Sequence, residues 1–303
     1  MAEPVPLLLN LIASSVTAAS RAGEIIRDVM RKGDLGIIEK GENDLQTEAD
    51  RSAQHCIIAS LAQKFPNITI IGEEEPNYTA VNPDWIANNP SESVLSKKCP
   101  DQYNDIQEKD VVVWVDPLDG TSEYAAGLLE NVTVLIGIAV GDRALGGVIH
   151  QPYFTSPEGG CIGRTIWGLQ GVGIGGFIPK APTKDKFILT TTRSHSNPLV
   201  EETLKKLNPD TILRVGGAGY KILLLLEGKA HAYVFASPGC KRWDTCAPEA
   251  ILTAIGGKLT DVHGNLYSYS KSTPYQNKGG VLAAVIEEYH EKCRKAIPPN
   301  ILK

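Results

Sequence analysis

The segment VVVWVDPLDGT, residues 111–121, ends a run of β-branched and aromatic residues on two carboxylates, Asp116 and Asp119. The run is typical of a buried strand, where charged side chains are rare unless they are paired or meet solvent. Pro117 fixes the backbone between the two aspartates, so the carbonyl of Leu118 could face the same point. The segment therefore offers several oxygen donors at the end of one strand.

A second apolar run, NITIIG at 67–72, leads directly into Glu73. If the two runs are neighbouring strands of one sheet, their three carboxylates converge at its edge. Carboxylates crowded in this way repel one another, and some of them would stay protonated at neutral pH. A divalent cation removes the conflict, and oxygen ligands suit Mg²⁺ or Ca²⁺ rather than Zn²⁺. Mg²⁺ held by few carboxylates completes its shell with water and substrate phosphate.

A fourth carboxylate, Asp244, follows Trp243 at the expected start of a helix far along the chain. Each carboxylate also has a purely structural interpretation. Asp-Pro and Asp-Gly are common turn pairs, any glutamate of the run GEEE could simply be solvated, and Asp is a good helix N-cap. Taken together, the carboxylates favour a metal site in a cleft between two lobes, with Asp244 as the ligand from the second lobe.

The composition is that of an ordinary globular protein, with 303 residues, 42% of them hydrophobic and 21% charged. The net charge of −5 argues against a nucleic-acid or anionic membrane surface, because both require a basic face. The six cysteines form no C-x-x-C pair or regular framework, so we expect reduced thiols. No apolar run approaches the ~18 residues of a membrane span. These features predict a cytoplasmic protein with a small-molecule substrate and no nucleic-acid or membrane partner.

The expected elements divide the chain into two lobes. Apolar residues at helical spacing predict a first helix that ends at Gly33 and a second that covers residues 43–66, where Pro66 stops it. Gly141-Asp142 marks a hairpin between two β-rich segments, and residues 76–100 read as a surface excursion with one short helix. We expect an α+β lobe at about 1–185 and, where strands alternate with helices, an α/β lobe at about 186–303.

Three motifs resemble those of the inositol monophosphatase superfamily, the metal-dependent, lithium-sensitive phosphomonoesterases. They are DPLDGT (116–121), GEE (72–74) and WDTCAPEAILTAIGG (243–257), in the order and spacing of that family. The segments GDLGIIEK, DLQTEADR, TTTRSHSN, RVGGAGYKI and YVFASPGCKRWDTCAPE resemble its 3′(2′),5′-bisphosphate nucleotidases. One departure is Ser122, where a lysine is expected beside the phosphate. The resemblance implies a single phosphatase domain with the layered αβαβα sugar-phosphatase fold.

The resemblance also assigns roles to residues. Asp50 and Thr121 match the pair that positions and deprotonates the attacking water; taken alone, they would be read as a solvated helix face and a helix N-cap. The remaining matches are ligands for two to three Mg²⁺ ions (Glu73, Asp116, the Leu118 carbonyl, Asp119 and Asp244) and substrate-binding positions (Gly120, Thr192, Ser194, His195, Gly217 and Lys221). Without the family, the glycines at 216–219 would be read as a tight turn and His195 as an ordinary surface residue.

The expected activity is Mg²⁺-dependent removal of the 3′-phosphate from adenosine 3′,5′-bisphosphate, which yields AMP and phosphate. The resemblance extends the expected substrates to the 5′-phosphosulfate analogue and inositol 1,4-bisphosphate. An inositol mono- or polyphosphate phosphatase is the alternative within the same enzyme class. A non-catalytic sensor on the same fold, or an interaction protein with incidental acidic turns, are the alternatives outside it. The oligomeric state stays open.

Overall fold

The computed structural model describes residues 5–41, 44–77, 79–156, 159 and 162–302. Two large β-sheets form its framework, beside a two-stranded sheet of β1 (Ile38–Gly41) and β2 (Asp44–Gln46). The six-stranded sheet has the order β3 (Thr69–Gly72), β4 (Val111–Asp119), β5 (Thr133–Val140), β6 (Arg143–Thr155), β7 (Ile162–Leu169) and β8 (Gly173–Gly175). The five-stranded sheet has the order β10 (Thr211–Val215), β9 (Ile188–Thr192), β11 (Ala232–Phe235), β13 (Val281–Ala284) and β12 (Lys258–Thr260).

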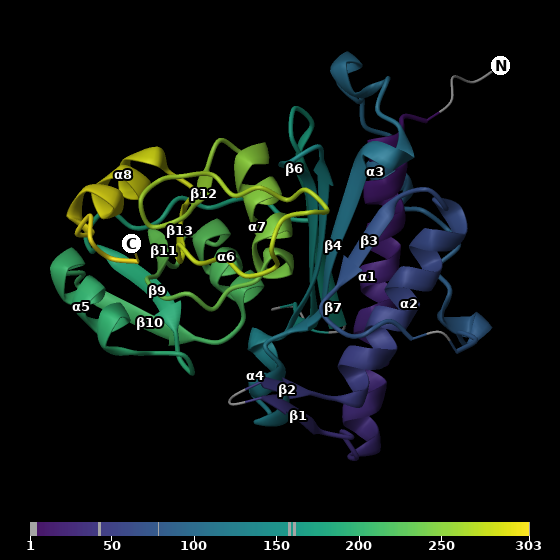
Figure 1. The fold of residues 1–303 in the computed structure, drawn as a ribbon, viewed down its shortest axis with the longest axis horizontal. Coiled ribbons are helices and arrows are strands. Elements are labelled where there is room, and N and C mark those ends of the chain that lie inside the picture. Colours follow the sequence, from purple (N-terminus) through teal and green to yellow (C-terminus); the bar gives the residue numbers. More distant parts are fainter. Residues whose placement is uncertain (1–4, 42–43, 78, 157–158, 160–161, 303) are drawn as a thin grey trace.

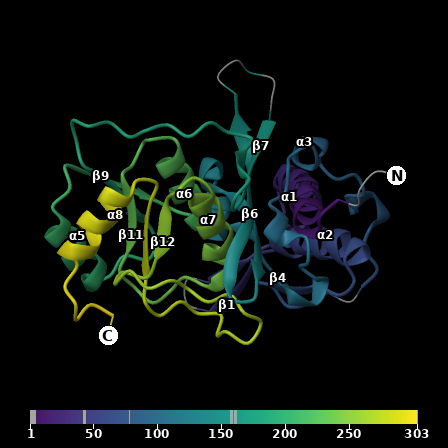
Figure 2. The same ribbon diagram turned by 90° about the horizontal axis from the view of Figure 1, so that it is seen from above.

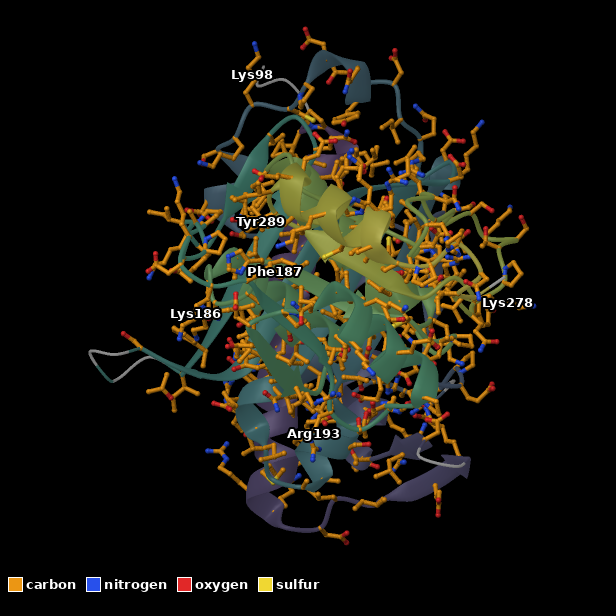
Figure 3. All side chains as sticks on the ribbon, turned by 90° about the vertical axis from the view of Figure 1, so that its left-hand side faces the viewer. Lys98, Lys186, Phe187, Arg193, Lys278 and Tyr289 are labelled. Atoms are coloured by element: carbon orange, nitrogen blue, oxygen red, sulfur yellow. The ribbon has the colours of Figure 1, made fainter. Side chains whose placement is uncertain are left out.

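Helices and sheets alternate in five layers (Figures 1 and 2). The helices are α1 (Leu7–Lys32), α2 (Glu48–Lys64), α3 (Glu92–Leu95), α4 (Thr121–Ala125), α5 (Pro198–Leu207), α6 (Ala218–Leu226), α7 (Arg242–Ala254) and α8 (Glu287–Ala296). Helices α1 and α2 cover one face of the six-stranded sheet, and α6 and α7 lie between the two sheets. Helices α5 and α8 form the outer layer (Figure 3). The layered fold expected from the sequence is confirmed.

A row of glycines lets α7 lie directly on the six-stranded sheet. Gly137, Gly147 and Gly168 stand opposite one another on β5, β6 and β7. A Cβ atom added to Gly147 would lie 2.5 Å from the carbonyl oxygen of Ala247, and one added to Gly137 would lie 2.5 Å from the Cβ of Cys246. Real Cβ atoms do not approach other atoms so closely, so side chains at these positions would displace the helix. The glycines therefore set the depth of α7, which carries Asp244.

Several expectations for the elements are confirmed. Helix α1 ends at Lys32 with Gly33 as its left-handed C-cap, at a φ of 81°. Strands β5 and β6 pair antiparallel across Gly141-Asp142. The segment 76–100, expected to be a surface excursion, contains the short helix α3. All strands of the six-stranded sheet precede residue 186 and those of the five-stranded sheet follow it, whereas the division into folding lobes stays a prediction.

Other expectations for the elements are wrong. The second helix begins at Glu48 because Thr47 caps it, and Asp44–Gln46 before it form β2 instead. Sequence analysis gave no signal for β1, β12 or α8. Among the described cysteines, Cys56, Cys99, Cys240, Cys246 and Cys293 are free thiols and buried. Cys161 lies outside the described residues. No helix in the described part of the chain has the length and apolarity needed to span a membrane.

Candidate active site

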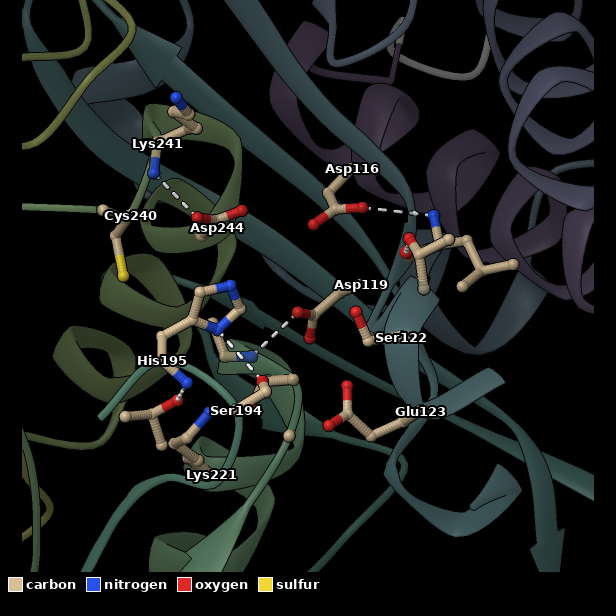
Figure 4. Close-up of a pocket in the computed structure, with 18 of the residues that line it drawn as sticks. Asp116, Asp119, Ser122, Glu123, Ser194, His195, Lys221, Cys240, Lys241 and Asp244 are labelled. Carbon is tan, nitrogen blue, oxygen red and sulfur yellow. Dashed lines mark hydrogen bonds between the residues drawn. The ribbon is translucent and has the colours of Figure 1, made fainter. Parts of the chain in front are cut away.

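A cavity of about 310 Å³ lies between two groups of elements (Figure 4). The ends of β3 and β4 form one side of it, and the end of β9 with the starts of α6 and α7 forms the other. Asp116 and Asp119 enter it from β4 and Glu123 from α4, whereas Asp244 and Lys221 enter it from α7 and α6 on the opposite side. The predicted site residues that line it are Glu73, Asp116, Leu118, Asp119, Gly120, Thr121, Thr192, Ser194, His195, Gly217, Lys221 and Asp244. Asp50 does not line the cavity and lies behind the residues that do.

Three of the predicted carboxylates meet at the sheet edge. Strands β3 and β4 are parallel neighbours, and the Glu73 N–H donates to the Val115 carbonyl at 3.0 Å. The carboxyl of Asp116 lies within hydrogen-bonding reach of both Glu73 and Asp244. Burial, aided by the neighbouring negative charges, raises the pKa of Glu73 to about 8 and that of Asp244 to about 7. The same causes raise the pKa of Asp116 well above its ordinary value.

The Asp119 carboxylate is partly occupied by hydrogen bonds from neighbouring residues of the protein. In the β4–β5 ladder Asp116 pairs with Leu135 while Asp119 pairs with Thr133, so a bulge at residues 117–118 redirects the end of β4. Oδ1 of Asp119 accepts the Ala218 N–H at 2.8 Å. Its Oδ2 accepts the N–H of residue 219 at 2.8 Å and the Thr133 hydroxyl at 2.7 Å. A carboxylate oxygen accepts about two hydrogen bonds, so Oδ1 keeps a lone pair for a cation.

These donors fit an open Mg²⁺ site. The side chains of Glu73, Asp116 and Asp244 and the Leu118 carbonyl are all hard oxygen ligands, and the crowding that disfavours the ionised form of the three carboxyls is what a bound cation would relieve. Among the described residues, no group of three or more His, Cys, Asp or Glu side chains is arranged so that these side chains alone could hold a metal ion. Mg²⁺ commonly keeps several waters and binds substrate oxygens, so it does not need such a set.

Asp50 and Thr121 form the hydrogen-bonded pair that sequence analysis anticipated. The Thr121 hydroxyl lies 3.0 Å from Oδ1 of Asp50 and 3.1 Å from the Leu118 carbonyl oxygen. Asp50 also accepts the Thr47 N–H at 2.8 Å, which places it in the capping box of α2. Burial raises its pKa to about 6, although its hydrogen bonds with Thr47 and Thr121 act in the opposite direction. The reading of Asp50 as a solvated helix residue is wrong, because it is 0% exposed.

Two N-cap interpretations are also wrong. Helix α4 begins at Thr121, and its N-cap is Gly120 with a φ of 92°, a left-handed conformation that favours glycine. Helix α7 begins at Arg242 after the N-cap Lys241, and the Lys241 N–H donates to Asp244 Oδ2 at 2.7 Å. Asp244 therefore lies in the first turn of the helix, three residues after the N-cap, where the positive end of the helix dipole supports its negative charge.

The opposite wall carries the predicted substrate-binding residues. The Thr192 hydroxyl accepts the His195 N–H at 3.0 Å, and Ser194 Oγ lies 3.0 Å from His195 Nδ1. Lys221 donates from Nζ to the Gly217 carbonyl at 2.8 Å. Burial lowers the pKa of Lys221, against the opposing effect of the Asp119 charge. This wall therefore offers hydroxyl, imidazole and ammonium groups, and Ser122 lines the same cavity.

The residues that fix the backbone just after β3 were not identified from the sequence. Gln54 accepts the Glu74 N–H at 2.9 Å and donates to the Glu74 carbonyl at 2.7 Å, which fixes the backbone just after Glu73. Lys40 of β1 forms ion pairs with Glu74 at 2.8 Å and Glu73 at 3.4 Å. The glutamate run was the available signal, but spacing alone could not show which glutamate faces Lys40. The interaction of Glu123 with Arg193 at 2.8 Å was also missed.

The fold and this acidic cavity place the chain in a known family. The inositol monophosphatase family model matches residues 8–300, and the chain belongs to that family. It is 56% identical over 288 residues to human 3′(2′),5′-bisphosphate nucleotidase 1, with 94% of each chain covered. The extragenic suppressor protein suhB from Bartonella henselae superposes with a TM-score of 0.69 at 20% identity, over 95% of this chain and 98% of that one. An IMPase/NADP phosphatase structure complexed with Mg²⁺ and phosphate gives a TM-score of 0.65 at 16% identity, over 92% and 91%.

Proposed function

We propose that this chain is a Mg²⁺-dependent 3′(2′),5′-bisphosphate nucleotidase that hydrolyses the 3′-phosphate of adenosine 3′,5′-bisphosphate to give AMP and phosphate. The relationship to the human nucleotidase over 94% of the chain supports this substrate class. The observation that carries the proposal is the cavity in which Glu73, Asp116 and Asp244 crowd together beside the Thr121–Asp50 pair. Such a wall repels a phosphate dianion unless cations are bound to it.

The family depends on Mg²⁺ in general, and the acidic residues are the proposed holders of two to three ions. Glu73, Asp116, Asp119, Asp244 and the Leu118 carbonyl are the proposed ligands. Bound Mg²⁺ would neutralise the phosphate dianion and polarise the attacking water and the ester. The 3′ leaving oxygen would lie on the side of Asp244.

The chain's own contribution to water attack is a proton path. Thr121 has one hydroxyl proton and two acceptors at similar distance, Asp50 Oδ1 and the Leu118 carbonyl. If the carbonyl is engaged by a cation, the hydroxyl proton is directed toward Asp50. The Thr121 oxygen can then accept a proton from the attacking water while Asp50 receives the hydroxyl proton. A pKa of about 6 leaves Asp50 ionised at neutral pH and a stronger base than an ordinary aspartate.

The half of the substrate that does not react is proposed to meet the wall formed by Gly120, Thr192, Ser194, His195, Gly217 and Lys221. Lys221 and His195 lie on the opposite side of the cavity from Asp116, which suits a molecule with phosphates at two ends (Figure 4). Substrates with a 5′-phosphosulfate or an inositol 1,4-bisphosphate skeleton share the second anionic group. An inositol monophosphate lacks it and is expected to be a poorer substrate.

Phosphate release from a substrate panel tests the proposal. The panel contains adenosine 3′,5′-bisphosphate, its 5′-phosphosulfate analogue, inositol 1,4-bisphosphate and inositol 1-phosphate, each with Mg²⁺ or with a chelator. We expect the highest kcat/KM with the adenosine bisphosphate, no turnover with the chelator, and inhibition by Li⁺. A preference for inositol 1-phosphate would reassign the enzyme to the inositol phosphatases. The proposed cytoplasmic location requires a separate measurement, by imaging in cells.

A further inference from the structure

Glu123 places a buried negative charge beside the proposed phosphate site. It follows Thr121 by two residues, lines the cavity, and is 2% exposed. A carboxylate facing an anionic substrate from a buried position is unfavourable unless a cation neutralises it. Glu123 is not among the proposed metal ligands, so its role requires another explanation.

The cation that pairs with Glu123 comes from the five-stranded sheet, on the opposite side of the cavity. Arg193 directly follows β9, and its Nη2 and Nε lie 2.8 and 3.3 Å from Oε1 of Glu123. The carboxylate side chain is 3% exposed and that of Arg193 42%. Arg193 is labelled in Figure 3, where it lies on the surface of the molecule. The pair thus joins α4, which follows β4 of the six-stranded sheet, to the loop that follows β9 of the five-stranded sheet.

The Glu123 carboxylate lies beside two glycine turns of the cavity wall. A Cβ atom added to Gly216 would lie 1.8 Å from Cδ of Glu123, so the carboxylate occupies the space of the missing side chain. A Cβ atom on Gly120 would lie 3.7 Å from its Oε2. Both glycines line the cavity. Glu123 therefore packs closely against the turn at Gly216 and is within ordinary contact distance of Gly120.

Arg193 also lies inside the loop proposed to bind the non-reacting half of the substrate. Thr192 precedes it, and Ser194 and His195 follow it, within a segment closed by the His195 N–H bond to the Thr192 hydroxyl. The Arg193 N–H donates to the Val215 carbonyl at 3.2 Å, so the backbone of the loop is tied to β10 while its side chain reaches α4. The Arg193 side chain therefore links this loop to α4, on the proposed Mg²⁺ side of the cavity.

We propose that the Glu123–Arg193 ion pair is a positioning device that sets the distance between the reacting-phosphate side of the cavity and the loop that recognises the second phosphate. This inference rests on the proposed nucleotidase function. It makes Glu123 and Arg193 determinants of selectivity for bisphosphorylated over monophosphorylated nucleotides. Neither residue needs to touch the reacting phosphate.

The test compares adenosine 3′,5′-bisphosphate with adenosine 3′-phosphate, which lacks the second phosphate. Arg193→Met leaves an unpaired carboxylate in the cavity, so its KM should rise for both substrates. The double variant Glu123→Gln/Arg193→Met removes that charge but leaves the loop unanchored. Its KM should rise about tenfold or more for the bisphosphate, with kcat and the KM for the monophosphate within about threefold of the unchanged enzyme. Arg193→Lys should restore part of the lost selectivity.

Arg214→Met is the matched control, because Arg214 of β10 forms an ion pair of the same 2.8 Å length with the exposed Glu201 of α5 and does not line the cavity. It should leave both KM values unchanged, and melting curves verify that each variant is folded. Equal effects of the double variant on the two substrates, or none, would refute the positioning role. If the unchanged enzyme neither hydrolyses adenosine 3′,5′-bisphosphate nor binds AMP by calorimetry, the proposed function fails and this inference fails with it.

Discussion

At the scale of single residues, the proposed mechanism separates the side chains that would hold metal ions from the side chain that would accept a proton. Asp116 lies close to both Glu73 and Asp244, the three being proposed metal ligands, whereas Asp50 makes its hydrogen bonds with hydroxyls and an N–H. Asp50 could be found from the sequence only through the family resemblance. Its position on a helix near Thr47 gave no sign that it is fully buried.

Asp50→Asn should abolish most turnover while leaving binding intact. The amide keeps the size of the side chain and can still bond to Thr121, but it cannot take up the hydroxyl proton. We expect kcat to fall by about 100-fold or more, as for loss of a general base, with Mg²⁺ and AMP affinities by calorimetry within about threefold. The exposed Glu48→Gln in the same helix turn is the control. Parallel losses of binding and rate would contradict the role as base.

A second single residue, His150, should make the stability of the fold depend on pH. It is 3% exposed in β6, with Nδ1 2.8 Å from the Thr165 hydroxyl, and burial, with a further effect from the charge of Arg27, lowers its pKa to about 3. As the pH falls from about 6.5 toward 3, the unfolded chain binds a proton at this position that the folded chain does not bind. The free energy of unfolding therefore falls, by at most about 1.4 kcal/mol per pH unit.

Denaturant unfolding of the unchanged protein and His150→Gln at several pH values between 7 and 4 measures this effect. The variant should lose less stability on acidification than the unchanged protein, whatever its stability at pH 7. The exposed His195→Gln serves as the control. Identical pH dependence of His150→Gln and the unchanged protein would show that this histidine does not carry the effect.

At the scale of elements, the ends of strands and the starts of helices could be predicted where residues next to them in the sequence determine them. The apolar runs gave β3 and β4, and their meeting at one edge followed from the shared position of Glu73 and Asp116. The bulge at residues 117–118 was not predictable, since it arises from the pairing of β4 with β5. The start of α2 was placed too early because the polar segment before Thr47 pairs with β1, a contact that no local pattern reveals.

Gly72 tests how the end of β3 positions Glu73. A Cβ atom there would lie 2.2 Å from Oε1 of Gln54, the side chain that holds the backbone of Glu74. Gly72→Ala should force Gln54 away, displace Glu73, and destabilise the fold by about 1–3 kcal/mol. Titration of activity with Mg²⁺ should show a higher half-saturating concentration. Gly41→Ala, where the nearest atom is 4.0 Å away, should change neither quantity.

At the scale of the whole molecule, the site exists because one helix layer joins two sheets. Helix α7 belongs to the second half of the chain, yet it packs on β5 and β6 of the first sheet, so Asp244 reaches the end of β4. Taken together with the other carboxylates, Asp244 was predicted from the sequence to reach a cleft between two lobes as the ligand from the second lobe. The row of glycines that receives α7 was not recognised, because its members are far apart in sequence and become neighbours only through strand register.

Gly147→Ala should therefore weaken metal binding at a distance. The added Cβ would lie 2.5 and 2.8 Å from the carbonyl oxygen and Cα of Ala247, backbone atoms that cannot rotate away, so α7 must move from the sheet and take Asp244 with it. We expect a loss of about 2–3 kcal/mol of stability and a Mg²⁺ dissociation constant, by calorimetry on the folded variant, raised about tenfold or more.

The neighbouring Gly146 supplies the matched control, since it faces α1 on the other side of the same strand. A Cβ atom there would lie 2.7 Å from Cδ1 of Ile12, a side-chain end that can change rotamer. Gly146→Ala should lower the melting temperature without changing Mg²⁺ affinity. Because both variants disturb the same sheet, a difference in metal affinity between them isolates the depth of α7. Equal Mg²⁺ affinities would mean that the position of Asp244 does not depend on the glycine row.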